Sequence, residues 1–195
     1  MKTQPVNYDK LYNEARKLFF NYSNAYSLER KSEYLAYLLA LESGLRVSDL
    51  LEQKYSNFSY HEQLGKYCFT TFIKKTKSEH TGVISNELYH YIQEYKDAVR
   101  TIHNRSSEYI FYNYRTNKPY TRQWLHKRIK KIAKKLKFKN AGVHSIRKAS
   151  AIHVLNKTGS LSMAQYHLSH KRATTTDKYL GVTQATALEQ LARVF

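Results

Sequence analysis

The chain is poor in the residues that cross-link, kink or loosen a protein. Its 195 residues include one cysteine, Cys68, two prolines and six glycines. A single cysteine forms no internal disulfide and builds no cysteine-rich metal centre, which is typical of a protein in a reducing compartment. So few prolines and glycines leave little room for a flexible linker, and we expect one domain.

Long apolar segments are also scarce. The first residues are polar, and the longest apolar run, from Tyr34 to Leu41, is far shorter than the roughly 20 residues that a membrane-spanning helix needs. The sequence therefore predicts neither a secretory leader nor a membrane span. We expect a cytoplasmic protein.

Negative charge is in short supply as well. The chain has 15 Asp+Glu against 33 Lys+Arg, a formal net charge of +18 and a pI near 9.8. This balance predicts a polyanionic partner, although charge alone does not choose among DNA, RNA, an anionic membrane and a ribosome. A content of 42% hydrophobic and 14% aromatic residues argues against a disordered chain and for one domain with a proper core.

Apolar residues recur at helical spacing along most of the sequence. Between residues 8 and 20, for example, Leu11, Ala15 and Leu18 fall on one face. The same spacing, with its caps and breaks, predicts further helices at residues 28–41, 47–54, 86–103, 121–136, 145–157, 162–168, 174–179 and 184–194.

One region has the sequence pattern of a β-hairpin. Residues 67–73 alternate, with β-branched and aromatic side chains on one face, and residues 81–84 read as a returning strand. The polar segment 74–80 is then the turn, and it carries Lys75 and Lys77 at its tip. The fold class that follows is mainly α with a small antiparallel β-sheet (α+β).

The helix expected at residues 121–136 is strongly basic. Leu125, Ile129 and Ile132 form its apolar stripe, and lysine and arginine occupy the other sides. A solvated amphipathic surface is one explanation, but the dominance of one sign of charge favours a face that follows a phosphate backbone. The DNA contacts predicted on this basis are Lys77, Arg122, Lys127, Arg128, Lys130, Lys131 and Lys134.

Three basic residues stand in positions that suit phosphate binding. His144 and Arg147 are one helical turn apart, so they share a face. An arginine also offers a planar fork of donors to two phosphate oxygens. Arg46 lies between apolar residues, where it either pairs with Asp49 or meets an anion.

Other candidates are ordinary when taken alone. Lys75 and Lys77 are either solvated turn residues or a source of the proton for a departing oxygen, and the sequence does not choose between the two lysines. His170 is equally consistent with a surface or junction histidine and with a functional one. Tyr179 is one of 18 tyrosines, so its interest rests on its position.

Taken in order, these residues resemble the motifs of the tyrosine recombinase catalytic domain, the phage integrase family. The resemblance covers residues 28–182. It rests on Gly44-Leu-Arg46-Val-Ser-Asp49-Leu, Lys75-Thr76, His144-Ser-Ile-Arg147, Leu168-Ser-His170 and the following Tyr179. Ser169, Lys148 and Lys77 depart from the residues that are frequent in the family at their positions, but no catalytic group is lost.

The resemblance implies a metal-free and cofactor-free strand transfer. Tyr179 would attack a DNA phosphodiester and form a 3′-phosphotyrosyl link, and Arg46 and Arg147 would stabilise the charge on phosphate. His144 would act as acid or base, His170 would donate to a phosphate oxygen, and Lys75 would protonate the leaving 5′ oxygen. The outcome would be integration, excision, inversion or resolution of double-stranded DNA.

The family resemblance also implies an assembly. Four protomers would act on two duplexes, and we expect a homotetramer on DNA. Residues 1–183 are predicted to form a single catalytic domain without a separate N-terminal DNA-binding domain. The chain would then be a minimal recombinase, like the short fimbrial-switch invertases, or would rely on an accessory DNA-binding protein. The helical tail, residues 184–195, would dock on a neighbouring protomer or on its own domain.

Two other functions fit the same residues. A type IB topoisomerase-like nicking-closing enzyme uses a similar set of arginine, lysine, histidine and tyrosine. A non-catalytic DNA-binding regulator would need only the basic helix.

Overall fold

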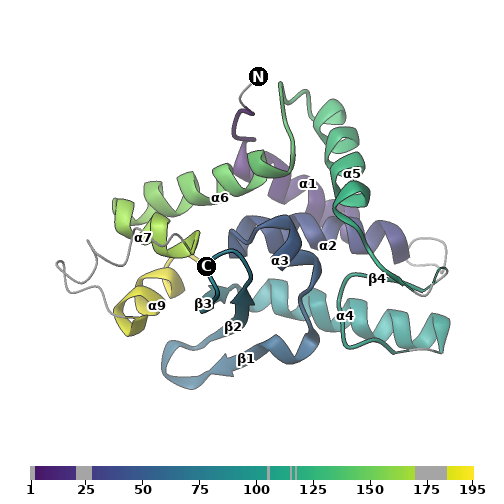
Figure 1. Cartoon of the computed structure of the whole chain (residues 1–195), viewed down its shortest axis with the longest axis horizontal. Coiled ribbons are helices and arrows are strands. Elements are labelled where there is room, and N and C mark those ends of the chain that lie inside the picture. Colours follow the sequence, from purple (N-terminus) through teal and green to yellow (C-terminus); the bar gives the residue numbers. More distant parts are fainter. Residues whose placement is uncertain (1–2, 21–27, 105, 115, 117, 170–183) are drawn as a thin grey trace.

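Helices make up most of the molecule in the computed structural model, which describes residues 3–20, 28–104, 106–114, 116, 118–169 and 184–195 (Figure 1). The described helices are α1 (Tyr8–Phe20), α2 (Leu28–Ser43), α3 (Val47–Leu51), α4 (Asn86–His103), α5 (Arg122–Lys135), α6 (Val143–Thr158), α7 (Leu161–His167) and α9 (Gln184–Ala192). The strands are β1 (Phe58–His61), β2 (Lys66–Ile73), β3 (Ser78–Ile84), β4 (Tyr112–Asn113) and β5 (Lys118–Pro119). The expected α+β class with small antiparallel sheets is confirmed. The helix predicted at residues 174–179 lies outside the described residues.

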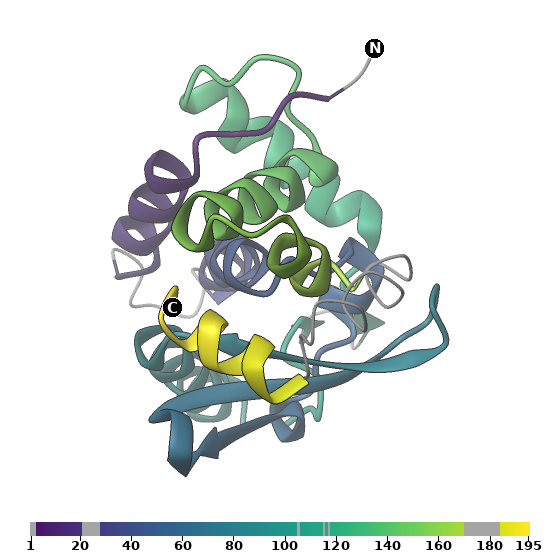
Figure 2. The same cartoon turned by 90° about the vertical axis from the view of Figure 1, so that its left-hand side faces the viewer.

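The larger sheet has three antiparallel strands in the order β1-β2-β3. Phe69 of β2 pairs with Phe58 of β1 on one side and with Gly82 of β3 on the other. Pairing of β2 with β3 continues to Ile73 and Ser78, so β3 begins before the predicted residue 81 and the turn is shorter than expected. The tip of this hairpin projects beyond the helices (Figure 2).

Helix α9 packs on its own chain and crosses the sheet (Figure 2). Ala187, Leu188 and Leu191 are buried in a second apolar cluster together with Cys68 of β2. The ammonium of Lys66 donates a hydrogen bond of 3.0 Å to the carbonyl oxygen of Phe195. Within the single chain, these contacts hold the tail against its own domain.

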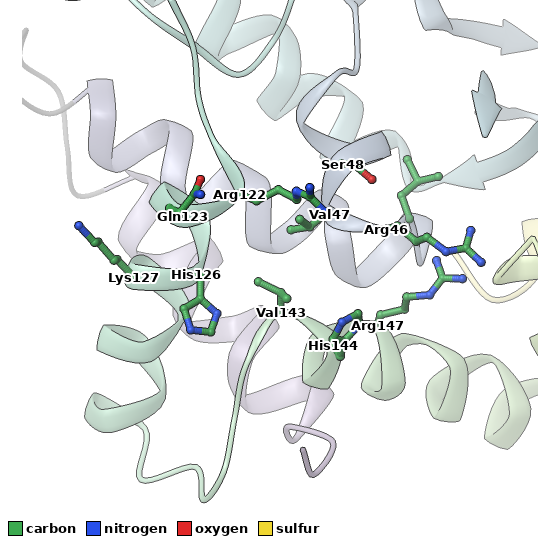
Figure 3. Close-up of a pocket in the computed structure, with 11 residues that line it drawn as sticks. Arg46, Val47, Ser48, Arg122, Gln123, His126, Lys127, Val143, His144 and Arg147 are labelled. Carbon is green, nitrogen blue, oxygen red and sulfur yellow. The ribbon is translucent and has the colours of Figure 1, made fainter. Parts of the chain in front are cut away.

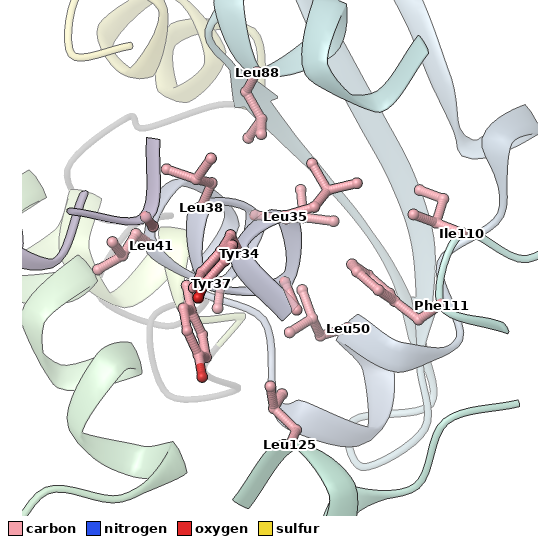
Figure 4. Close-up of a cluster of buried hydrophobic side chains, with 14 of the residues drawn as sticks. Tyr34, Leu35, Tyr37, Leu38, Leu41, Leu50, Leu88, Ile110, Phe111 and Leu125 are labelled. Carbon is pink, nitrogen blue, oxygen red and sulfur yellow. The ribbon is translucent and has the colours of Figure 1, made fainter. Parts of the chain in front are cut away.

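Helix α2 is the centre of the main core (Figure 4). All but two of its 16 residues are buried, whereas the sequence pattern predicted one apolar face. The reason is that α1, α4, α6 and β3 pack around it on different sides. Its residues Tyr37, Leu38 and Leu41 are fully buried. No helix in the described part of the chain is long and apolar enough to span a bilayer.

A buried carboxylate joins three elements near the end of α2. Glu42 accepts hydrogen bonds from the Ser85 amide at 2.7 Å, the Ser85 hydroxyl at 2.8 Å and the Tyr12 hydroxyl at 2.8 Å. Burial raises the pKa of Glu42, and the three donors act in the opposite direction. These bonds tie α1 and the start of α4 to α2 just before the turn that leads to Arg46.

The turn after α2 is closed by a buried histidine. Gly44 has φ +59°, and a Cβ atom there would lie 2.6 Å from Nε2 of His167, so only glycine fits. The Ser150 hydroxyl donates its one proton to the Leu41 carbonyl, and its oxygen lies 2.7 Å from Nε2 of His167. His167 therefore donates to Ser150, and α2, α6 and α7 are locked together at this point.

The buried histidines predict a loss of stability in acid. Burial is the main cause that lowers the pKa of His80 to about 4 and that of His167 to about 3, and the positive charge of Arg147 lowers both further. The unfolded chain takes up these protons below its ordinary pKa near 6.5, whereas the folded chain does not. The free energy of unfolding should therefore fall, by about 1.4 kcal/mol per pH unit for each histidine, as the pH drops from about 6.5 to about 4.

Urea unfolding at a series of pH values measures this slope. Replacing His80 with leucine should remove about half of it, whereas replacing the exposed His90 with asparagine should leave it unchanged. A slope that is the same in all three proteins would contradict the assignment.

Candidate phosphate-binding site

A pocket of about 560 Å³ lies between α3, α5 and α6 (Figure 3). It collects three residues of the predicted phosphate site and two of the predicted DNA contacts. Its lining residues include no carboxylate, and they are Leu45, Arg46, Val47, Ser48, Arg122, Gln123, His126, Lys127, Val143, His144 and Arg147. A pocket with four cationic side chains and two imidazoles suits an anion.

Arg46 occupies the N-cap position of α3, with extended backbone angles of φ −68° and ψ 151°. Its Nη1 atom is buried and has no hydrogen-bond partner among the described residues. Within those residues Arg46 forms no ion pair with Asp49, and Oδ2 of Asp49 is also buried without a partner. Burial raises the pKa of Asp49 and the nearby charge of Arg46 acts against this shift, so the two groups attract each other, while Nη1 of Arg46 is left for an anion; both alternatives for Arg46 stay open.

Arg147 is held from two directions. Its Nη1 donates to the carbonyl oxygen of Gly44, and its Nη2 donates to the carbonyl oxygen of Leu168. Burial and the nearby charge of Arg46 lower the pKa of Arg147 to about 10, while Asp49 acts in the opposite direction. Arg147 therefore stays charged at neutral pH, and its guanidinium group faces that of Arg46 (Figure 3). Two like charges so arranged favour a shared anion.

His144 lies one turn before Arg147 and lines the same pocket, which confirms that the two side chains share a face. Helix α6 begins at Val143, two residues earlier than predicted, so His144 belongs to its first turn. The Gly142 amide donates to the Ser145 hydroxyl at 3.0 Å and closes this end of the helix. The His144 ring is exposed.

Helix α5 brings further basic residues to the pocket. Its predicted apolar stripe is buried, and the Thr121 hydroxyl caps the helix by accepting from the Trp124 amide at 3.2 Å. Arg122 and Lys127 line the pocket, and the other exposed lysines predicted to bind DNA are Lys130, Lys131 and Lys134. These side chains are accessible, as a phosphate-binding face requires.

Arg128 has a different environment from its basic neighbours. Its guanidinium group forms an ion pair with Glu29 and lies 3.5 Å from a carboxylate oxygen of Glu33. Only 23% of its side chain is exposed. Arg128 thus joins α5 to α2, and this geometry gives no support to its predicted DNA contact.

Some pocket residues were not expected from the sequence. His126 and Gln123 come from α5, Ser48 comes from α3, and Val143 contributes to the apolar wall. His126 follows Arg122 by one helical turn, so the spacing of the two residues carried a usable signal.

The remaining predicted residues are not brought into the pocket. Lys75 and Lys77 are exposed in the turn between β2 and β3, which confirms the hairpin tip, but neither lines the pocket. Lys77 has φ +52°, and its amide donates to the Ile73 carbonyl at 2.9 Å. His170 and Tyr179 lie outside the described residues. Within the described residues, no group of three or more His, Cys, Asp and Glu is arranged to hold a metal ion.

Comparison with known proteins gives related sequences along most of the chain. The profile of the phage integrase family matches residues 7–186. A probable integrase/recombinase from Bacillus subtilis, YoeC, is 25% identical over 158 residues, which are 81% of this chain and 82% of YoeC. A probable integrase/recombinase of Acholeplasma phage L2 is 24% identical over 94% of this chain and 61% of its own length.

Solved structures show the same fold. The site-specific recombinase XerH, in a post-cleavage complex with its difH substrate, superposes with a TM-score of 0.71 at 18% identity. The match covers 93% of this chain and 50% of XerH, so the chain spans about half of that protein. The lambda integrase catalytic core superposes with a TM-score of 0.57 at 21% identity and is covered to 96%. The chain belongs to the phage integrase family and has the catalytic-domain fold of the tyrosine recombinases.

Proposed function

We propose that the protein is a site-specific DNA recombinase that cleaves and rejoins strands of double-stranded DNA through a 3′-phosphotyrosyl intermediate. The observation that carries the proposal is the convergence of Arg46, His144 and Arg147 on one pocket without a lining carboxylate. Family membership agrees with recombination in general. The proposal covers integration, excision, inversion and resolution alike, because a phosphate-binding pocket carries no information about which pair of sites is joined.

The proposed reaction exchanges one ester for another. The Tyr179 hydroxyl oxygen attacks phosphorus, the bond to the 5′ oxygen breaks, and a tyrosyl 3′-phosphate forms. The tyrosine proton leaves to a base, and the 5′ oxygen gains a proton and departs as a hydroxyl group. A 5′ hydroxyl of another strand then reverses the step. Because the covalent bond stores the phosphoester energy, no ATP is needed.

The described residues are suited to the charge that builds up on phosphate. Arg147 is fixed by two backbone carbonyls, so this donor is oriented before DNA arrives, and Arg46 offers an Nη1 that has no partner among the described residues. His144 is exposed in the same pocket, where we assign it the role of acid or base toward Tyr179. His170 is assigned a hydrogen bond to a phosphate oxygen, and Lys75 the proton for the 5′ oxygen.

The assembly is part of the proposal. A complete exchange needs four active sites, and we propose a homotetramer on DNA. The exposed lysines of α5 would follow the backbone on either side of the cleaved phosphate. Recognition of the site would involve an accessory DNA-binding protein if the catalytic domain alone does not select it.

A trapped covalent adduct tests the proposal directly. The full chain is incubated with a pool of nicked duplexes of randomised sequence, in which the short cleaved strand diffuses away and prevents religation. We expect a protein–DNA adduct that survives denaturing electrophoresis, and we expect Tyr179→Phe to abolish it because the nucleophilic oxygen is removed. Sequencing of the trapped DNA would identify the site.

Tyr166 provides a matched control. Its hydroxyl donates to the Thr81 carbonyl at 3.0 Å, and it belongs to α7 outside the pocket. The Tyr166→Phe protein should therefore retain the adduct. No adduct across the whole pool would refute the recombinase assignment, and relaxation of supercoiled DNA without any preferred site would point to a topoisomerase-like enzyme.

Arg46 should show opposite effects on activity and on stability. Replacing Arg46 with alanine removes a donor to the phosphate and should slow adduct formation by about 10²–10³-fold. It also removes a half-buried cation whose Nη1 has no hydrogen-bond partner in the described chain and whose charge lies near that of Arg147, so the free energy of unfolding without DNA should be unchanged or rise by about 1 kcal/mol.

Urea unfolding and single-turnover cleavage measure the two effects. Arg16→Ala is the control, because Arg16 is half-exposed in an ion pair with Glu87, and its loss should change neither quantity greatly. A large loss of stability in Arg46→Ala would indicate a structural role instead.

Sulfur substitution distinguishes the two hairpin lysines. Lys75→Ala should slow cleavage of ordinary DNA by about 10²–10⁴-fold, because the 5′ oxygen leaves without its proton donor. A substrate with sulfur at the 5′ bridging position should restore the rate, since a thiolate leaves without protonation. Lys77→Ala should show neither effect. If rescue is seen with Lys77→Ala and not with Lys75→Ala, the two roles are exchanged.

A further inference from the structure

A second pocket, of about 670 Å³, adjoins the phosphate-binding site. Ser48 and Arg122 line both pockets, so they form the wall between them. The other lining residues come from the end of α3, the β2–β3 turn and the segments around β4 and β5, and they are Leu51, Glu52, Lys74, Tyr109, Pro119 and Tyr120. We call this second pocket the tyrosine pocket.

The charge of the tyrosine pocket differs from that of its neighbour. It contains Glu52, the one carboxylate among the described residues that line either pocket. The Lys74 ammonium pairs with Glu52 at 2.5 Å, which neutralises much of its charge. A phosphate is therefore better placed in the first pocket, and the tyrosine pocket suits a neutral group with hydrogen-bond donors for a carboxylate oxygen.

Backbone hydrogen bonds hold the main chain at Tyr109 and at Tyr120. Tyr109 forms an antiparallel bridge with Lys54, and the neighbouring Ile110 amide donates to the Gln53 carbonyl at 3.0 Å. The Tyr120 amide donates to the carbonyl of the fully buried Phe111 at 3.1 Å.

The rings themselves are also oriented by their neighbours. The Tyr120 ring stacks on Trp124 with 4.0 Å between centroids and 17° between planes. The Lys54 ammonium lies 5.1 Å from the Tyr109 ring. Both side chains remain partly exposed. Aromatic walls that are oriented before binding lose little conformational freedom when a planar ligand enters.

We propose that the tyrosine pocket receives an unpaired nucleobase of the DNA strand whose phosphate occupies the adjoining pocket. This inference rests on the proposed function, because the strand must first be placed in the phosphate site. A base and its neighbouring phosphate belong to one covalent chain, so they can occupy two pockets that share a wall. Strand exchange requires bases beside the cut to leave their partners, and tyrosine rings stabilise such bases by stacking.

Single-stranded oligonucleotides test the pocket without knowledge of the recombination site. The probes are an oligothymidylate of about ten nucleotides and an abasic strand with the same number of phosphates. Their dissociation constants for the full chain are compared at fixed salt concentration. Stacking of one base should make the thymidylate bind about 5- to 150-fold more tightly than the abasic strand, because the electrostatic contribution is the same for both.

Variants locate the effect. Tyr109→Ala and Tyr120→Ala should each reduce the ratio of the two dissociation constants toward one, whereas Lys127→Ala should weaken both probes equally and keep the ratio. Tyr60→Ala is the matched control: Tyr60 is 52% exposed on β1 and lines neither pocket, so its loss should leave the ratio unchanged. Photocrosslinking of an oligonucleotide that carries 5-iodouracil to the unmodified chain is a second measurement that does not depend on the folding of a variant, and we expect the crosslinks at Tyr109 or Tyr120.

The inference is overturned if the ratio is near one in the unmodified chain, or if crosslinks fall only on aromatic residues outside the tyrosine pocket. This failure is distinct from failure of the proposed function. A covalent adduct at Tyr179 with no base preference would reject the tyrosine pocket alone. A base preference that depends on Tyr109, with no adduct on any duplex, would reject the recombinase and leave a single-strand binding protein.

Discussion

The pair of hydrogen bonds that hold the Arg147 guanidinium group is the contact on which the site depends. One bond reaches the carbonyl of Gly44 in the turn after α2, and the other reaches the carbonyl of Leu168 at the end of α7. Both acceptors are neutral backbone atoms, so they orient the cation without cancelling its charge. The same contacts connect α6 to the turn that leads to Arg46 and to the segment that leads to His170.

In this arrangement, positive charges lie close together in the site and repel one another. Arg46 and Arg147 lie together, Arg46 has a buried nitrogen atom without a partner in the described chain, and the buried His80 and His167 beside them are kept neutral. Burial that holds the histidines neutral also keeps further positive charge away from Arg147. A phosphate would relieve the repulsion between the two arginines, and the rest of the core, centred on α2, supplies the stability that keeps them in place.

Much of this could be predicted from local sequence, and the failures have identifiable physical causes. Helix α1 and helix α4 follow from periodicity and appear with the expected bounds, and the β2–β3 hairpin appears where it was expected, with β3 beginning three residues early. His144 and Arg147 share a face because they are one helical turn apart. The prediction for Arg128 lost its support because the acidic residues that it contacts belong to α2, far away in the sequence. The early start of α6 was missed because it depends on a cap made by Ser145.

The sequence by itself determined the chemical groups, the excess of positive charge and the order of the motifs. Those properties belong to single residues or to neighbours along the chain, and periodicity reports them directly. Only the tertiary structure decided which groups meet: Arg46 with Arg147, Arg128 with Glu29, α9 with its own β3, and the tyrosine pocket with the phosphate site. These contacts join segments that are distant in the sequence. They form because the helices pack around α2, and the neighbouring element decides which side of each helix is buried and which is exposed.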